Sequence, residues 1–139
     1  MNKFCLDPAF SNIDYKIGEL DLCYLYLNDN AHYPWVILIP KRANVSEIIS
    51  LSTQEQHLLM DEISLVSKAM QALFQPDKLN VAALGNIVPQ LHIHIIARYK
   101  NDLAWPQPVF GKDSSPYNIK EREEIIKRLW DSLVLLLKG

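Results

Sequence analysis

The chain has 139 residues, of which 49% are hydrophobic and 22% are charged, a balance typical of a globular protein with one core. Its net charge of −2 argues against the basic surface of a nucleic-acid-binding protein, and its apolar runs are too short to span a bilayer. We therefore expect one domain over residues 1–139, in a soluble cytoplasmic protein with no N-terminal leader and with Cys5 and Cys23 as free thiols.

The first half of the chain predicts a pair of strands. Residues 1–19 favour no particular element. Residues 20–27 are rich in strand-forming types, and a turn cluster at 28–34 separates them from the apolar run 35–39. We expect the two strands to be antiparallel neighbours, followed by a short helical turn over residues 45–49.

Two helices are predicted from capping signals and helical spacing. Ser52 and Glu55 have the spacing of a capping box, and apolar residues then recur on one helical face as far as Phe74. Asn118 and Glu121 have the same spacing ahead of a second apolar face. The residues expected to be buried on the two helices are Leu59, Ile63, Val66, Met70, Leu73, Ile125, Ile126, Leu129, Trp130 and Leu133.

The stretch from Pro89 to Arg98 alternates polar and apolar residues, as a half-buried strand does. The polar members Gln90, His92 and His94 would line one face of that strand. Imidazole titrates near neutrality, so a row with two imidazoles can bind anions, transfer protons or act as a nucleophile. The apolar members would face a core, and they are Leu91, Ile93 and Ile95.

A turn precedes this stretch. Residues 81–84 are typical of a short strand, and Gly85-Asn86 of a tight turn, in which glycine can adopt a positive φ and leave backbone N–H groups free. Free amides beside a row of histidines suit the binding of phosphate.

Residues 85–98 resemble the signature of the histidine triad (HIT) superfamily, in which His-x-His-x-His-x-x, with apolar x, follows a glycine-rich turn. The sequence departs from that signature at Gln90, which stands in the place of the first histidine. The resemblance implies an α+β fold with an antiparallel β-sheet of about five strands, a long helix and a C-terminal helix. The order of the predicted elements also suits an antiparallel sheet with helices on one face.

The resemblance implies a function for each polar residue of the row. His92, the central histidine, would attack the α-phosphorus of a nucleotide and form a nucleotidyl-imidazole intermediate, which water then hydrolyses. His94 would donate a hydrogen bond to a phosphate oxygen. Gln90 can donate and accept hydrogen bonds as neutral imidazole does, but it cannot titrate. The expected activity is that of a nucleotide hydrolase or nucleotidyl transferase acting on adenine dinucleoside polyphosphates or phosphoramidates.

Further contacts with the nucleotide are implied by the resemblance. The turn would offer backbone amides to phosphate, while Ile87 occupies a position where family members often carry a hydroxyl residue that helps the leaving group. Asn28 matches in position a polar residue that holds the ribose hydroxyls, and Leu25 and Leu27 would line the base. The expected binding residues are Asn28, Asn80, Gly85, Asn86, Ile87 and Val88.

Other charged and aromatic residues have two interpretations each. Lys41, Arg42 and Arg98 would attract a polyphosphate, or they are ordinary surface cations. Trp105 and Phe110 would stack on a base or reach a subunit interface, or they hold their proline-rich loop in place.

Two other functions remain open. A zinc site on His92 and His94 needs further ligands, and His32 and His57 are remote in sequence, so we expect no metal and no cofactor. A non-catalytic, nucleotide-binding dimeric module is the main alternative, favoured by the departures from the signature. The expected partners are a nucleotide and, from the resemblance, a second copy of the chain in a homodimer, with no nucleic acid and no membrane.

Overall fold

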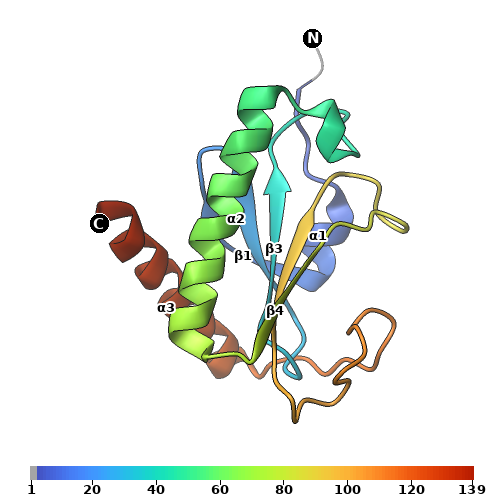
Figure 1. Cartoon of the computed structure of the whole chain (residues 1–139). Coiled ribbons are helices and arrows are strands. Elements are labelled where there is room, and N and C mark those ends of the chain that lie inside the picture. Colours follow the sequence, from blue (N-terminus) through green and yellow to red (C-terminus); the bar gives the residue numbers. More distant parts are fainter. Residues whose placement is uncertain (1–2) are drawn as a thin grey trace.

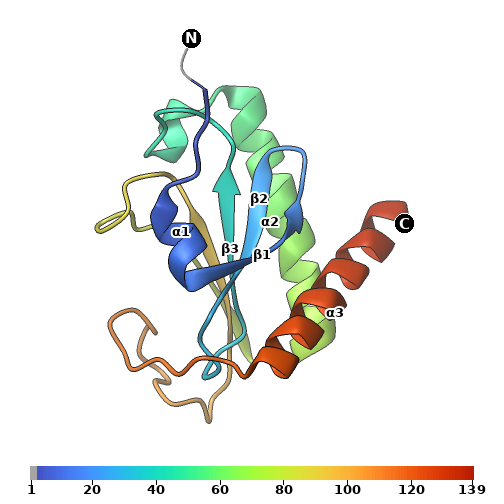
Figure 2. The same cartoon turned by 180° about the vertical axis from the view of Figure 1, so that it is seen from behind.

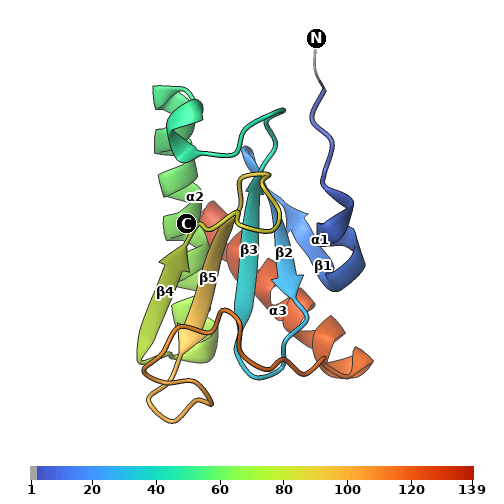
Figure 3. The same ribbon diagram turned by 90° about the vertical axis from the view of Figure 1, so that its right-hand side faces the viewer.

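Five strands form an antiparallel sheet in the computed structural model, which describes residues 3–139 (Figure 3). The strands are Asp14–Glu19 (β1), Cys23–Asn28 (β2), Trp35–Pro40 (β3), Lys78–Ala82 (β4) and Ile93–Arg98 (β5). They lie in the order β1-β2-β3-β5-β4, and each neighbouring pair is antiparallel. The α+β fold with a sheet of five strands is therefore confirmed.

Two long helices cover one face of the sheet (Figure 1). The first, α2, spans Thr53–Phe74 and begins with the predicted capping box between Ser52 and Glu55. The second, α3, spans Ile119–Lys138 and is capped by the Asn118 side chain. Within residues 3–139 neither these nor any other helix has the length and apolar character needed to cross a membrane. The helix residues buried in the main core are Leu59, Val66, Ala69, Met70, Leu129 and Leu133, and the other predicted members pack around them.

Two close contacts fix these helices against the strands. Glu62 of α2 is 5% exposed, and its carboxylate accepts hydrogen bonds from the backbone N–H groups of Leu22 and Cys23, at 2.8 and 2.9 Å. Gly18 lies at an irregularity in the β1–β2 register, and a Cβ there would come within 2.1 Å of the Trp130 ring on α3. The absence of a side chain at Gly18 therefore makes room for that ring.

The other face of the sheet is covered by the N-terminal segment and by the loop after β5 (Figures 1 and 2). A short helix, α1, spans Pro8–Ile13 and is capped by Asp7, whose side chain accepts a hydrogen bond from the Ala9 N–H. Phe10 of α1 is buried against the sheet together with Val109 of the loop. The two predicted helices thus lie on one face, as expected, while α1, which was not predicted, lies on the other.

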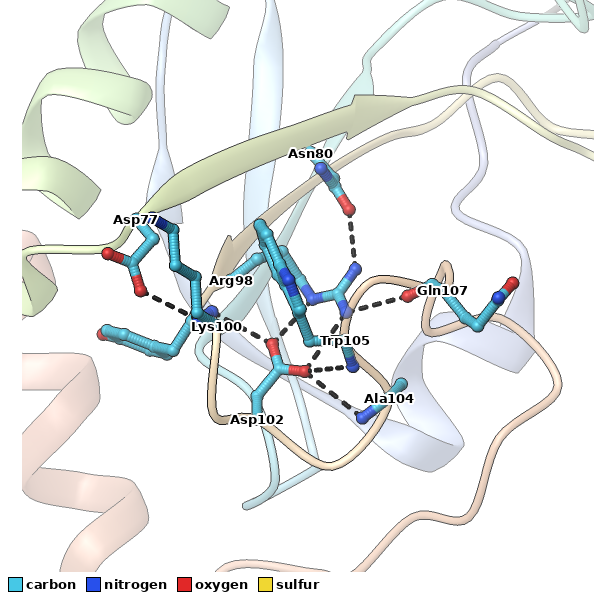
Figure 4. A network of polar contacts seen from close by, with 9 residues as sticks. Asp77, Asn80, Arg98, Lys100, Asp102, Ala104, Trp105 and Gln107 are labelled. Carbon is cyan, nitrogen blue, oxygen red and sulfur yellow. Dashed lines mark hydrogen bonds and ion pairs between the residues drawn. The ribbon is translucent and has the colours of Figure 1, made fainter.

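A polar network fastens the loop to the end of β5 (Figure 4). Arg98 is 1% exposed and donates hydrogen bonds to both oxygens of Asp102, to the Asn80 side chain and to the Gln107 carbonyl. Burial alone would raise the pKa of Asp102, but the bond from Arg98 and two backbone donors outweigh it and lower the pKa. The backbone N–H groups that bond to Asp102 belong to Tyr99, Ala104 and Trp105.

Several boundaries differ from those predicted in the first half of the chain. Residues 1–19, for which we predicted no element, contain α1 and β1, and residues 1–2 lie outside the described chain. The strand predicted over residues 20–27 is β2 and begins only at Cys23. The helical turn expected over residues 45–49 is a 3₁₀ helix at Ile48–Ser50 (η1).

The signature region also differs in its boundaries. The strand predicted over residues 81–84 is β4 at Lys78–Ala82, because its limits follow the pairing with β5, which starts at Lys78 opposite Arg98. The strand predicted from Pro89 begins at Ile93, since the Leu91 N–H donates instead to a loop carbonyl, that of Val45.

Candidate active site

The alternation of side chains around His92 and His94 is as predicted. Leu91, Ile93 and Ile95 belong to the core beneath α2 and α3. The two histidines lie on the opposite face, with their ring centroids 4.8 Å apart. Each histidine is 8% exposed, so the face that carries them is enclosed rather than open to solvent.

A backbone carbonyl fixes the tautomer of His92. Its Nδ1 lies 2.7 Å from the carbonyl oxygen of Gln90. A carbonyl oxygen only accepts hydrogen bonds, so Nδ1 carries the proton when the ring is neutral. The other nitrogen, Nε2, then has a free lone pair, which is the state that a nucleophile requires.

The indole of Trp35 fixes the opposite tautomer of His94. Trp35 Nε1 lies 2.9 Å from His94 Nδ1, and an indole N–H only donates, so Nδ1 must be the accepting nitrogen. The proton of neutral His94 is therefore on Nε2. Burial, with a smaller contribution from the neighbouring His92, lowers the pKa of His94 to about 4. His94 is thus a neutral hydrogen-bond donor at physiological pH.

Aromatic rings enclose the two histidines. Phe10 of α1 packs edge-on against His92, with ring centroids 5.0 Å apart. Phe110 packs in the same way against His94 at 5.0 Å and against Trp35 at 5.4 Å. Phe110 therefore covers the site, whereas Trp105 lies beside Arg98 and holds the loop.

His92 opens onto a hollow of about 270 Å³. His92 and Leu91 line it together with residues 46–49 and 83–85. Gly85 has a φ of +77°, the left-handed conformation expected for the turn. The structure therefore brings Gly85 and His92 together, as the sequence predicted.

The remaining residues of the turn, 86–88, differ in how far they are exposed to solvent. Asn86 is exposed, and Ile87 is 94% exposed, so neither side chain is held by the protein. Val88 is half-buried and packs against the cluster of side chains on the histidine face. Phosphate contacts from this turn stay a prediction.

Gln90 does not continue the row of histidines along the strand, because it precedes β5. Its side-chain Oε1 accepts a hydrogen bond from the Asp7 N–H at 2.9 Å, and its Nε2 donates to the Cys5 carbonyl at 2.8 Å. The carboxamide is therefore engaged with the N-terminal segment.

The two predicted asparagines lie apart from the His92 hollow. Asn28 donates to Asp14 at 2.9 Å, and it lines a separate hollow of about 440 Å³ that Trp35 also lines. Burial raises the pKa of Asp14 to about 6, and the bond from Asn28 opposes that shift. Asn80 accepts a hydrogen bond from Arg98 and belongs to the loop network.

The predicted apolar wall for a base is wrong. Leu25 and Leu27 are fully buried in the core beneath the long helices, on the face of the sheet away from the histidines. Tyr24 and Tyr26 belong instead to the cluster of side chains on the histidine face.

The predicted cations are all engaged in the described chain. Lys41 pairs with Glu19, and Arg42 pairs with Glu55. Arg98 is buried, so it is not the surface cation that the sequence suggested. Across residues 3–139, no group of three or more histidine, cysteine or acidic side chains is placed to hold a metal ion.

Two residues of the site were missed by the sequence reasoning, Trp35 and Phe10. Trp35 was assigned only to an apolar strand, although the alternation along β3 puts it on the same face as Ile37, which pairs with His94. That pairing register was the missing information. Phe10 lies in a segment for which we predicted no element.

One family model of known proteins matches most of the chain. Residues 10–101 match the family model of the HIT domain. Seventy residues are 31% identical to a bis(5'-adenosyl)-triphosphatase of Saccharomyces cerevisiae, a match that covers 47% of this chain and 34% of the yeast protein. The match thus spans about a third of the length of that curated relative.

Solved structures resemble the chain over nearly its whole length. A histidine triad protein from Bradyrhizobium japonicum is 41% identical, with a TM-score of 0.92 over 95% of this chain and 99% of that one. One from Marinobacter aquaeolei VT8 is also 41% identical, with a TM-score of 0.93 over 97% and 99% of the two chains. One from Sinorhizobium meliloti 1021 is 36% identical, with a TM-score of 0.90 over 93% and 96%.

Proposed function

Because the chain belongs to the HIT domain family, we propose that it is a nucleotide hydrolase or nucleotidyl transferase that acts at the α-phosphate through a nucleotidyl-histidine intermediate on His92. The observation that carries the proposal is the opposite tautomers of the two histidines. His92 is held with a free lone pair on Nε2, and His94 is held with a proton on Nε2. One ring is thus prepared to attack phosphorus and the other to donate to an oxygen.

In the first step, the Nε2 lone pair of His92 forms a bond to the α-phosphorus, and the bond from phosphorus to the leaving group breaks. The leaving group departs with the electron pair of that bond. The imidazole ring of His92 becomes positively charged, and its Nδ1–H remains bonded to the Gln90 carbonyl, which stabilises that charge. The N–H of His94 donates to an oxygen of the phosphate as negative charge develops there.

In the second step, water attacks the phosphorus and the P–N bond breaks. The electron pair of that bond returns to His92 Nε2, the nucleoside monophosphate leaves, and a proton passes to solvent. A neutral His94 fits both steps, because it donates a hydrogen bond without adding a second positive charge beside His92.

An adenine dinucleoside polyphosphate is the proposed substrate class, with an adenosine phosphoramidate as the alternative leaving-group chemistry. Support for the first comes from the 31% identity with the yeast bis(5'-adenosyl)-triphosphatase. The hollow beside Asn28, with Asp14 next to it, is the proposed position of the ribose. Hydroxyl groups of a ribose suit a carboxamide and a carboxyl as partners.

The test is the mass of the intact protein after brief exposure to bis(5'-adenosyl) triphosphate. The reaction is stopped with denaturant at alkaline pH, because the P–N bond is labile to acid. We expect a mass increase of one adenylyl group in the native protein and none in His92→Ala. The matched control is His57→Ala, since His57 is an exposed histidine of α2 and should leave the adduct unchanged.

Two results would count against the proposal. An adduct of equal yield in His92→Ala would place the covalent step on another residue. Binding of the nucleotide with neither adduct nor turnover would favour the alternative, a nucleotide-binding module without catalysis.

A further inference from the structure

Gln90 departs from the triad of the family, and the segment that it binds lies outside the region that the family model matches. The match begins at residue 10, whereas Gln90 is hydrogen-bonded to Cys5 and Asp7. We propose that Gln90 is a positioning residue, whose carboxamide holds the N-terminal segment on the sheet so that Phe10 keeps the His92 ring in its reactive orientation. This inference rests on the proposed function of His92.

The contact between Gln90 and the segment resembles the pairing of two strands. The Cys5 carbonyl and the Asp7 N–H flank a single residue of the chain, and the carboxamide donates to the first and accepts from the second, at 2.8 and 2.9 Å. The N–H and C=O of one residue in a parallel neighbouring strand would bond in the same way. The segment is therefore held at two adjacent points by one side chain.

The contact between Gln90 and the segment also affects the start of α1. Asp7, whose N–H is bound by Gln90, also caps α1 through its side chain, which accepts from the Ala9 N–H at 2.9 Å. Phe10 follows within the first turn of that helix and is 3% exposed. Its ring packs edge-on against His92 at 5.0 Å. The position of Phe10 thus depends on the carboxamide at residue 90.

Two contacts from the same residue therefore act on His92. The backbone carbonyl of Gln90 holds Nδ1 at 2.7 Å and fixes the tautomer. Its side chain, through Asp7 and Phe10, restricts how far the ring can tilt about that hydrogen bond. A nucleophile held in this way loses less orientational freedom when it reacts.

A histidine at residue 90 would not replace this contact. The donor and acceptor atoms of a carboxamide lie at one end of the side chain and point in a similar direction, as they must to reach Cys5 and Asp7 together. The two nitrogens of imidazole point away from each other, so one ring cannot bond to both backbone groups of the segment. The glutamine is thus matched to the N-terminal segment of this chain.

The experiment compares three single variants, and the double variant of two of them, with one control. Gln90→Met keeps the length of the side chain but removes both hydrogen bonds, Gln90→His restores the residue of the family signature, and Phe10→Leu removes only the ring beside His92. The control is Asn118→Leu, because Asn118 is a carboxamide that also makes one donor and one acceptor bond, at the start of α3. Turnover of bis(5'-adenosyl) triphosphate gives kcat and KM for each protein.

We expect Gln90→Met and Phe10→Leu each to lower kcat about tenfold, with KM changed less than about threefold, because orientation affects the reacting state more than binding. Gln90→His should fall with them rather than exceed the native rate. The double variant of Gln90→Met and Phe10→Leu should be no slower than about the slower single variant, since both remove the same restraint. Asn118→Leu should keep the native kcat.

Nuclear magnetic resonance gives two readouts that do not depend on turnover. In Gln90→Met, hydrogen exchange of the Asp7 N–H should accelerate at least about tenfold, because that amide loses its acceptor. The ring ¹⁵N signals of His92 should change in both Gln90→Met and Phe10→Leu, and should stay native in Asn118→Leu.

Different experimental results would overturn this inference and the proposed function. Native kcat and native His92 signals in Gln90→Met would overturn the positioning role, and so would a kcat above native in Gln90→His. An adduct that persists in His92→Ala would overturn the proposed function instead. If no substrate is turned over, unchanged Asp7 exchange and His92 signals in Gln90→Met still overturn the positioning role, and changed ones support it.

Discussion

Two buried polar clusters lie on one face of the sheet, one at each end of β5, and they differ in how many of their hydrogen bonds are made. At the loop end, Arg98 makes four hydrogen bonds to Asp102, Asn80 and Gln107. Asp102 accepts three more from backbone N–H groups. At the other end, His92 and His94 each have a hydrogen bond at Nδ1, and their Nε2 atoms have no partner within residues 3–139.

The difference separates a structural cluster from the proposed reactive one. A buried guanidinium that makes four hydrogen bonds within the protein stabilises one arrangement of the chain and has little capacity left for a substrate. A buried ring that uses one nitrogen to fix its orientation keeps the other for chemistry. Both clusters are buried to a similar degree, so burial alone does not distinguish them.

The largest expected effect is a loss of activity on substitution of His92, in the histidine cluster. His92→Ala should lower kcat by about 10³-fold or more, because it removes the proposed nucleophile, while the free energy of unfolding should change by less than about 2 kcal/mol. Steady-state kinetics and urea denaturation measure the two quantities. A rate within tenfold of native would show that the unpaired nitrogen of His92 is not what the reaction uses.

At the loop end of β5, we expect a large effect on stability and a small effect on activity. Asp102→Ala leaves the Arg98 charge buried without its partner, so the free energy of unfolding should fall by about 3–5 kcal/mol. The kcat of the molecules that remain folded should change little, because Asp102 does not contact either histidine. Asp131→Ala is the control in urea denaturation, since its pair with Lys127 is exposed. Equal stability of the two variants would contradict the structural role of Asp102.

An intermediate effect is expected at Trp35. Trp35→Phe keeps an aromatic ring but removes the N–H that holds His94 Nδ1, so both tautomers of His94 become available and kcat should fall about tenfold. Kinetics and the ring ¹⁵N signals of His94 measure the change. Trp130→Phe, on the helix side of the sheet, is the control. A single unchanged tautomer in Trp35→Phe would mean that another contact fixes His94.

The smallest effect is expected at Asp14, a buried carboxyl with one side-chain partner. Burial raises its pKa to about 6, above its ordinary value of about 4, so the folded protein holds a proton that the unfolded chain releases. The stability that Asp14 contributes is therefore present below about pH 4 and lost as the pH rises through 6, by about 1–3 kcal/mol.

Asp14→Asn cannot ionise and should raise the free energy of unfolding at pH 8 but not at pH 4. Urea denaturation at the two pH values measures the difference, with Asp61→Asn on α2 as the exposed control. Equal gains at both pH values would show that the variant acts by something other than removing the charge.

Much of the fold could be predicted because its signals are local. The capping box at Ser52 and the capping side chain of Asn118 lie next to the helices that they start, and both helices form where predicted. The segment 3–19 holds a local signal in the Asp7 cap of α1, but α1 and β1 are also fixed by distant partners. Asp7 is held by Gln90, and Gly18 is placed against Trp130.

The candidate site, too, could be predicted only where its signals are local. The alternation of residues put His92 and His94 on one face from sequence alone, and the structure agrees. Their tautomers could not be predicted, because the partner of His94 is Trp35, which is 59 residues away in the chain. Gln90 was expected beside the histidines for the same local reason, but its partners lie 83 and 85 residues away.

The loop after β5 is tied near its two ends. Asp102 fixes its first turn, and the Ala31 N–H bonds to the Ser115 carbonyl near its far end at 2.6 Å. Between these two anchoring points, the hollow beside Asn28 is lined by Gly111, Lys112 and Ser114, which take no part in the buried network. Substitutions in this short span would therefore alter the hollow without removing the anchors. It is the part of the chain where selection or directed mutagenesis can change the shape of the hollow while the histidine pair stays constant.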